Sequence, residues 1–295
     1  MKYLKRFKIH SDYEEYVNGG GAVLPNVSYT EDTLKVYYNP IHDYSQDYFT
    51  MVVTVGGDVT WTGIDNNATL YYSKDNGTTW SEPSTNITLS VNEGDKVLWK
   101  GEISPLYETG IGAFSGSTDV RYTVEGNVLS LLFGDDFKEQ TSLKDKMFIF
   151  QCLFKNNKSI TSAENLSLPS ATLTSYCYQQ MFEGCTNLVY APKVLPATTL
   201  AFECYHYMFR NCTSLVTTPE LPATTLTNSC YQQMFSGCTK LNHIKCLATN
   251  ISASSCLWNW VSNVASSGTF VKASSMASWP TGTSGIPSGW TVVDA

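Results

Sequence analysis

The sequence predicts an antiparallel β-sandwich or small barrel followed by an α/β solenoid of short repeats. Of the 295 residues, 13% are aromatic and only 15% are charged, which excludes a disordered chain and a coiled coil. Short β-branched and aromatic runs separated by glycine turns fill 47–134, which indicates antiparallel strands. A segment that begins LP(S/A)(A/T)TL recurs in the C-terminal half, which is typical of stacked repeats. The expected fold class is therefore β plus α/β solenoid.

The charge and hydropathy patterns exclude two classes of partner. The net charge is −7 and the chain has three arginines, so we expect no basic surface for nucleic acid. The longest apolar run, 128–133, is far too short to insert into a membrane. The basic N-terminus has no apolar stretch after it, so we also expect no secretory signal.

Three segments are predicted along the chain. Residues 1–40 end at Pro40 and are too short for a large core of their own, so we expect an anchoring arm that docks on another subunit. Residues 41–134 are the expected β domain. Residues 135–295 are the expected repeat domain with a C-terminal cap.

The β domain is predicted from runs that end at glycine-containing turns. The runs expected as strands are 50–55, 58–62, 68–73, 78–81, 86–91, 95–101, 120–124 and 127–133. Trp61, Trp80 and Trp99 recur at 19-residue intervals within them. They either fill the core or form a surface for stacking sugars.

No pattern in the sequence predicts catalysis. Ser73 to Trp80 resembles the Asp-box hairpin of sialidase propellers, but it occurs once, and the three arginines lie in separate segments. The four histidines are isolated from a second ligand or a nucleophile, and no phosphate-binding or nucleophile motif is present. We expect a protein that is not an enzyme, with no catalytic residues, cofactor or metal.

Three clear repeats begin at Leu168, Leu195 and Leu221, with spacings of 27 and 26 residues. Within the first, Leu173, Cys177 and Met181 follow the i, i+4 spacing of a helix face, and a glycine follows where a helix would end. The segments 186–189 and 213–216 predict brief strands, which Pro192 and Pro219 are expected to stop. One strand and one helix in about 26 residues is the size of a leucine-rich repeat.

The cysteines recur at fixed positions of the repeat. Cys177, Cys204, Cys230 and Cys256 share one position, and another holds Cys185, Cys212 and Cys238. We expect each set to form a column of small buried side chains with free thiols. Zinc would require converging thiolates and histidines, which this spacing does not provide.

The pattern CYxxMFxxCTxL resembles the BspA-type leucine-rich repeats of gut Bacteroidales and their phages, over roughly 140–295. The opening 40 residues are similar to the N-termini of virion proteins from gut-bacterial phages and prophages. The repeat resemblance implies adhesion and surface recognition. The missing export signal favours a protein that is assembled in the host cytoplasm and works in the virion.

We therefore expect a viral structural protein of a bacteriophage: a head fibre, capsid decoration or tail-fibre component. Residues 1–40 would contact other virion proteins of the capsid or tail, and the repeats would bind a host-surface glycan or protein. A homo-oligomer is expected, and analogy with phage fibres favours a trimer. The alternative is a bacterial cell-surface adhesin. The candidate ligand-facing residues occupy two repeat positions that vary: Tyr190, Thr217 and His243, and Tyr176, Glu203 and Ser229.

Overall fold

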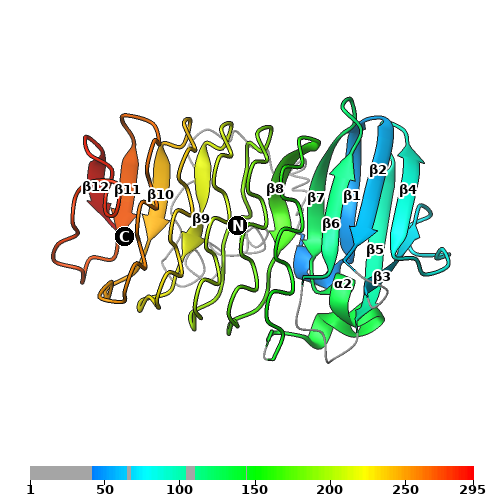
Figure 1. Cartoon of the computed structure of the whole chain (residues 1–295), viewed down its shortest axis with the longest axis horizontal. Coiled ribbons are helices and arrows are strands. Elements are labelled where there is room, and N and C mark those ends of the chain that lie inside the picture. The colour runs from blue at the N-terminus through cyan, green and yellow to red at the C-terminus, as the bar shows by residue number, and fades with distance from the viewer. Residues whose placement is uncertain (1–41, 65–67, 104–109, 144) are drawn as a thin grey trace, which may run out of the picture. The chain divides into compact units, whose positions relative to one another are not determined.

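The computed structural model describes residues 42–64, 68–103, 110–143 and 145–295. The expected anchoring arm, 1–40, lies outside the described residues. Tyr44–Ala295 forms one compact unit. Within this unit the strands follow one another along one direction, with β4 (Asn86–Val91) near one end and β12 (Thr291–Asp294) at the other (Figure 1).

Strands make up most of the regular structure. The remaining elements, in chain order, are the 3₁₀ helix η2 (Tyr44–Gln46), β1 (Phe49–Val55), β2 (Gly57–Gly63), β3 (Ala68–Ser73), β5 (Lys96–Ile103), β6 (Gly112–Gly116), β7 (Arg121–Asn127), the α-helix α2 (Ser130–Phe133), the 3₁₀ helix η3 (Gly134–Glu139), β8 (Ile160–Ser167), β9 (Thr217–Leu221), β10 (His243–Cys246) and β11 (Thr269–Lys272). They form three sheets, ordered β4-β2-β6, β3-β5-β1-β7-β8 and β12-β11-β10-β9.

The first two sheets share a core of aromatic side chains. Phe114 of β6 lies 5.6 Å from Phe49 of β1 and 5.1 Å from Trp99 of β5, measured between ring centroids. Trp61 and Trp99 are fully buried, so both are core residues. Each sheet has open edges in the described residues, so the small barrel offered as an alternative is wrong.

Three elements of the β domain differ from the prediction. The run 78–81 was expected to be a strand, but it forms none in the structure. The run 127–133 was expected to be a strand, but Ser130–Phe133 is the helix α2. Its Ser130 hydroxyl donates to the Trp99 carbonyl and accepts from the Phe49 amide, both at 2.9 Å, which fixes the turn against buried strands. β6 was missed because its sequence, GAFSG, has glycines in place of β-branched residues.

The predicted α/β leucine-rich-repeat solenoid is wrong. In the described residues the only α-helix is the four-residue α2, and the repeats contain none. The segment that the i, i+4 spacing predicted to be helical consists of consecutive turns. The protein is mostly β-sheet, and its repeats are stacked turns and short parallel strands.

The turns alternate between two kinds of hydrogen bond. The Gln179 amide donates to the Tyr176 carbonyl three residues back, at 3.1 Å, whereas the Tyr178 amide donates to Cys204 of the next repeat, at 3.0 Å. Every fourth residue has a positive φ: 63° at Tyr176, 58° at Gln180 and 73° at Gly184. Two residues therefore point into the core and the next two point outward, which also gives an i, i+4 spacing.

The parallel strands β9 to β12 stack beside these turns, one strand to a repeat. The strand expected at 213–216 instead begins at Thr217 and includes Pro219, which was expected to end it. The register shifts between His243 and Lys245 opposite this proline. Because the irregularity interrupts the ladder there, the missing N–H of proline is tolerated.

The core of the repeats consists of columns of equivalent side chains. Phe154, Phe182, Phe209 and Phe235 stack with centroid spacings of 5.2, 5.3 and 5.7 Å. The Cys185, Cys212 and Cys238 thiols each donate to the phenylalanine carbonyl of the preceding layer, at 2.9, 3.0 and 3.0 Å. Burial raises the pKa of Cys177 and Cys238 to about 12. These thiols are packing groups in the protonated form.

Candidate binding face

The first predicted row of ligand-facing residues lies along the strand edge of the repeats. Tyr190 and Thr217 form a parallel bridge, and His243 of β10 pairs with Thr217 of β9. Tyr190 is 47% exposed, Thr217 is exposed and His243 is half-buried. The structure therefore brings the three residues together as one row, which we call the bridge row.

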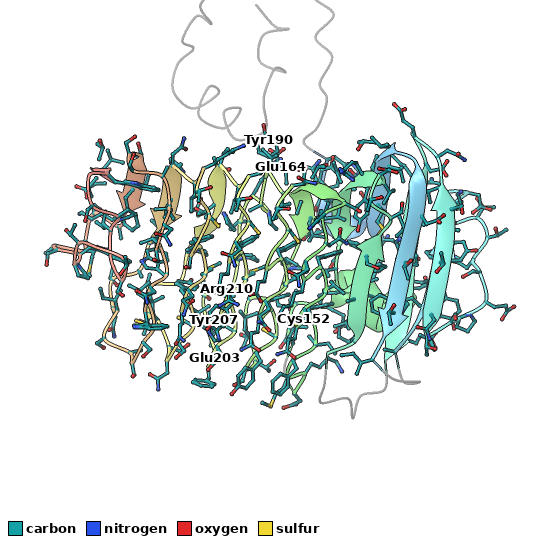
Figure 2. The ribbon with its side chains drawn as sticks, turned by 45° about the horizontal axis from the view of Figure 1, so that its top comes forward. Cys152, Glu164, Tyr190, Glu203, Tyr207 and Arg210 are labelled. Atoms are coloured by element: carbon teal, nitrogen blue, oxygen red, sulfur yellow. The ribbon has the colours of Figure 1, made fainter. Side chains whose placement is uncertain are left out.

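The second predicted row occupies one of the left-handed turn positions. Tyr176, Glu203 and Ser229 have φ values of 63°, 52° and 55°. Ser229 is only 9% exposed, so it presents little surface, whereas the other two are partly exposed. Figure 2 shows Tyr190 at one edge of the molecule and Glu203 toward the opposite edge, so the two rows do not form one site.

Glu203 belongs to a polar network that crosses three layers. Its Oε2 accepts from Gln179 Nε2 and from His206 Nδ1, each at 2.7 Å. Gln179 in turn accepts from Gln151 of the preceding layer. Because a carboxylate only accepts, the His206 proton lies on Nδ1. We call the outward side chains of 148–155, 176–184, 202–211 and 228–237 the turn face.

A row of charges runs across the same face. Glu183, 5% exposed, accepts from Arg210 Nε at 2.7 Å and lies 3.1 Å from Lys155 Nζ. Arg210 Nη2 also donates to the same carboxylate. Gln180 completes the set by donating to Glu183 at 2.6 Å. The nearly buried carboxylate is thus paired with cations from both neighbouring layers, the arrangement that a buried charge requires.

Aromatic rings lie among these polar groups. The Arg210 guanidinium carbon is 3.9 Å from the centroid of the Tyr207 ring. At the edge of the face the Phe148 ring stacks on the Tyr176 ring, with centroids 4.4 Å apart. The Phe202 ring meets the Tyr176 ring edge to face, with centroids 5.4 Å apart. Phe202 is 40% exposed. The turn face therefore combines exposed rings with polar groups whose orientation is fixed (Figure 2).

The His206 imidazole is the buried titratable base of this network. Its residue is 8% exposed, and its Nε2 has no hydrogen-bond partner among the described residues. Burial lowers the pKa of His206, and the nearby Arg210 charge acts in the same direction, while Glu203 opposes both. The imidazole is therefore neutral at pH 7.

The sequence prediction found Glu203 but missed the residues that make it part of a site. The signal was present: the central repeat reads YHYMFRN where its two neighbours read YQQMFEG and YQQMFSG. The core positions, held by tyrosine, methionine and phenylalanine, are the same in all three. The differences are confined to positions that face away from this core, although His206 and Glu183 are themselves nearly buried by their neighbours there. Comparing the repeats at every outward position, rather than at two, identifies His206, Tyr207 and Arg210.

A concavity in the β domain can be compared with the turn face. It measures about 350 Å³ and is lined by Tyr72, Ser73, Lys74, Asp75, Thr79, Trp80 and Ser81. The Asp75 carboxylate is engaged by the Thr79 hydroxyl at 2.6 Å and amide at 2.9 Å, which lower its pKa to about 2. Lys74 is paired with Asp95 at 2.8 Å. These polar groups stabilise the hairpin at 73–80, so we favour the turn face as the candidate binding site.

Two searches of the described residues found nothing further. They contain no group of three or more His, Cys, Asp or Glu side chains placed to hold a metal ion. They also contain no helix with the length and hydrophobicity to cross a membrane. Comparison of the chain with protein-family models, curated proteins and solved structures gave no match.

Proposed function

We propose that the chain is a structural component of a bacteriophage virion that binds a host-cell surface through the turn face. One observation carries the binding role: buried positions repeat from layer to layer, while outward positions change. Tyr205 and Tyr207, which flank His206, illustrate this difference. Tyr205 recurs in both neighbouring repeats, whereas Tyr207 does not. A constant core that supports a variable face is the arrangement of repeat proteins that bind ligands.

The fixed orientation of the polar groups supports binding rather than a solvated surface. Glu203 and Glu183 each contact two or more side chains, and each carboxylate has at least one partner from an adjacent layer. Side chains that are already ordered lose less conformational entropy when a ligand binds. The face is thus prepared for contact with a ligand.

The virion assignment is supported by the thiols and by the N-terminal resemblance. Eight of the nine cysteines are buried and all nine are free thiols, which suits assembly in a reducing cytoplasm. The similarity of 1–40 to phage virion N-termini supports attachment to the particle through that segment. Several copies on one particle would strengthen weak individual contacts.

The virion role is tested by mass spectrometry of purified particles from the strain that encodes the chain. We expect peptides of this chain to co-purify with capsid or tail proteins through a density gradient. Recovery of the chain on bacterial surfaces and not in particles would contradict the virion role and favour an adhesin.

The binding role is tested by pull-down of the purified chain with intact bacteria. A variant in which the central layer copies the third layer changes Glu203→Ser, His206→Gln, Tyr207→Gln and Arg210→Ser. We expect it to lose binding. A control with Tyr190→Thr and His243→Thr on the bridge row should bind as the wild type does; the reverse result would assign binding to the bridge row.

A further inference from the structure

Resting on the proposed function, we infer that the ligand of the turn face is a neutral polysaccharide, bound across the central layer. At four outward positions of this layer the side chains are Glu203, His206, Tyr207 and Arg210, whereas the third layer has Ser229, Gln232, Gln233 and Ser236. The backbone is the same, with φ values of 52° and 60° at Glu203 and Tyr207 and of 55° and 49° at Ser229 and Gln233. The turn backbone therefore does not require these four residues, although Arg210 also pairs with the Glu183 carboxylate.

The mixture of groups matches the two kinds of surface on a sugar. The Phe202 ring, which is 40% exposed, suits the C–H face of a pyranose, and the Tyr176 ring packs edge to face against it. Beside them Gln179 and Glu203 offer amide and carboxylate groups whose positions are fixed by their mutual hydrogen bond. Hydroxyl groups both donate and accept, so they pair with carboxylate, amide and guanidinium groups alike.

The charges favour a neutral ligand over an acidic one. Arg210 donates from both Nε and Nη2 to Glu183, so one of the two guanidinium edges that could hold a carboxylate in two-point contact is already engaged. The network contains two carboxylates, Glu183 and Glu203, against two cations, Lys155 and Arg210. Because His206 is neutral at pH 7, no net positive charge remains to attract an acidic sugar.

The regular spacing of the layers favours a polymer over a folded protein. Successive layers are separated by 5.2 to 5.7 Å at the stacked phenylalanines, and each layer places its outward side chains in the same orientation. A polysaccharide has a short translational repeat of its own, so one chain presents equivalent groups to successive layers. Protein partners are instead recognised through a few anchor side chains in closed pockets.

Affinity electrophoresis of the whole chain tests this inference. The gels contain mannan, galactan, glucomannan or arabinan, with polygalacturonate as the acidic comparison. We expect at least one neutral polysaccharide to retard the wild type. The apparent affinity of the wild type for that polysaccharide should be at least about tenfold higher than the affinity of the four-residue layer swap. The bridge-row control should be retarded as the wild type is. The swapped residues are those of the third layer, so an unchanged unfolding midpoint would show that the variant folds.

The outcomes separate this inference from the proposed function. Binding to intact bacteria without retardation in any neutral gel would overturn the polysaccharide and leave the binding role standing. Retardation that is strongest with polygalacturonate, or cell binding that survives periodate and is lost after protease treatment, would also overturn it. Failure to bind both cells and gels would contradict the two proposals together.

Discussion

The left-handed turn position before the second cysteine alternates between asparagine and glycine from layer to layer. Asn156, Gly184, Asn211 and Gly237 have φ values of 60°, 73°, 61° and 80°. A Cβ at Gly184 would meet the Asn156 side-chain oxygen, and a Cβ at Gly237 would meet that of Asn211. Asparagine tolerates this conformation, but its side chain fills the space that a Cβ would need at the same position of the next layer. Each asparagine thus requires glycine in the next layer.

We predict that Gly237→Ala lowers the free energy of unfolding by roughly 1–3 kcal/mol through backbone strain, with a further loss from the clash with Asn211. Adding Asn211→Gly should remove the clash and recover the stability lost to it, but not the stability lost to backbone strain. Gly94→Ala is the matched control, because Gly94 has a φ of 88° and no atom within 4 Å of the added Cβ. Urea unfolding measures all four proteins. Equal losses for Gly237→Ala and Gly94→Ala would show that the layer above does not restrict this position.

We predict that His206 makes stability depend on pH. Its pKa lies below the ordinary value of 6.5, mainly because of burial, with Arg210, Glu203 and Glu183 as the neighbouring charges. The unfolded chain therefore binds more protons than the folded chain below about pH 6.5. The free energy of unfolding should fall as the pH drops from 6.5 toward the lowered pKa.

His206→Gln, which places the residue of both neighbouring layers at this position, should remove that part of the pH dependence. The measurement is urea unfolding of both proteins between pH 7.5 and pH 5 at constant ionic strength. Parallel curves for the two proteins would contradict the prediction.

At the scale of elements, the strands of the β domain were predictable and the turns of the repeats were not. The runs that became β3 and β4 match the expected 68–73 and 86–91, because alternating residues between glycine turns have few other structures. Turns with a period of four residues and helices with a period of 3.6 both bring i and i+4 to one side. Over the two turns from Leu173 to Met181 the two periods cannot be distinguished.

The cysteine columns give a prediction about reactivity. Cys152 is half-buried, whereas the other eight cysteines are buried, and burial raises the pKa of each thiol. The thiolate is the reactive form, so a thiol reagent such as dithionitrobenzoate at pH 8 should modify Cys152 first and slowly. Cys152→Ser should abolish this phase, and all nine thiols of the wild type should react in denaturant. Rapid native modification of several thiols would contradict the packing of the columns.

At the scale of the molecule, the β domain and the repeats are joined by a continuous ladder. β8 pairs in parallel with β7, and an isolated bridge connects Ser162 of β8 to Tyr190. Phe154 continues the join inside, because it stacks on Phe114 at 5.7 Å and on Phe182 at 5.2 Å. The sequence predicted a change of architecture near residue 134. It gave no signal for this pairing, because parallel contacts between distant segments leave no local pattern.

The candidate site was predictable only in part for a related reason. Aligning the repeats placed Glu203 at a variable position, but the hydrogen bond that it accepts from Gln179 crosses between layers, and Gln179 also contacts Gln151 one layer further on. Whether an outward residue is solvated or part of a network depends on its neighbours in the adjacent layers. That information becomes available once the stacking register is known.

The layers make a final prediction possible, which concerns removal of one complete repeat. Deleting 195–220 joins Val194 to Leu221 and leaves the sequence LPATTL in place. The Phe182 ring would then meet Phe235, the Cys238 thiol would meet the Phe182 carbonyl, and Gly184 would lie against Gly237 without a clash. Because each layer contacts only its neighbours, the shortened chain should fold and unfold cooperatively, with roughly 1–4 kcal/mol less stability.

A deletion of half a repeat, 195–207, is the matched control. It would bring outward positions to the core, so we expect no cooperative unfolding in urea and no native circular dichroism. The full-repeat deletion should also lose binding to bacteria, because it removes Glu203, Tyr207 and Arg210 while keeping the fold. A folded half-repeat variant would mean that the layers are not equivalent. Retained binding by the full-repeat variant would place the ligand elsewhere on the molecule.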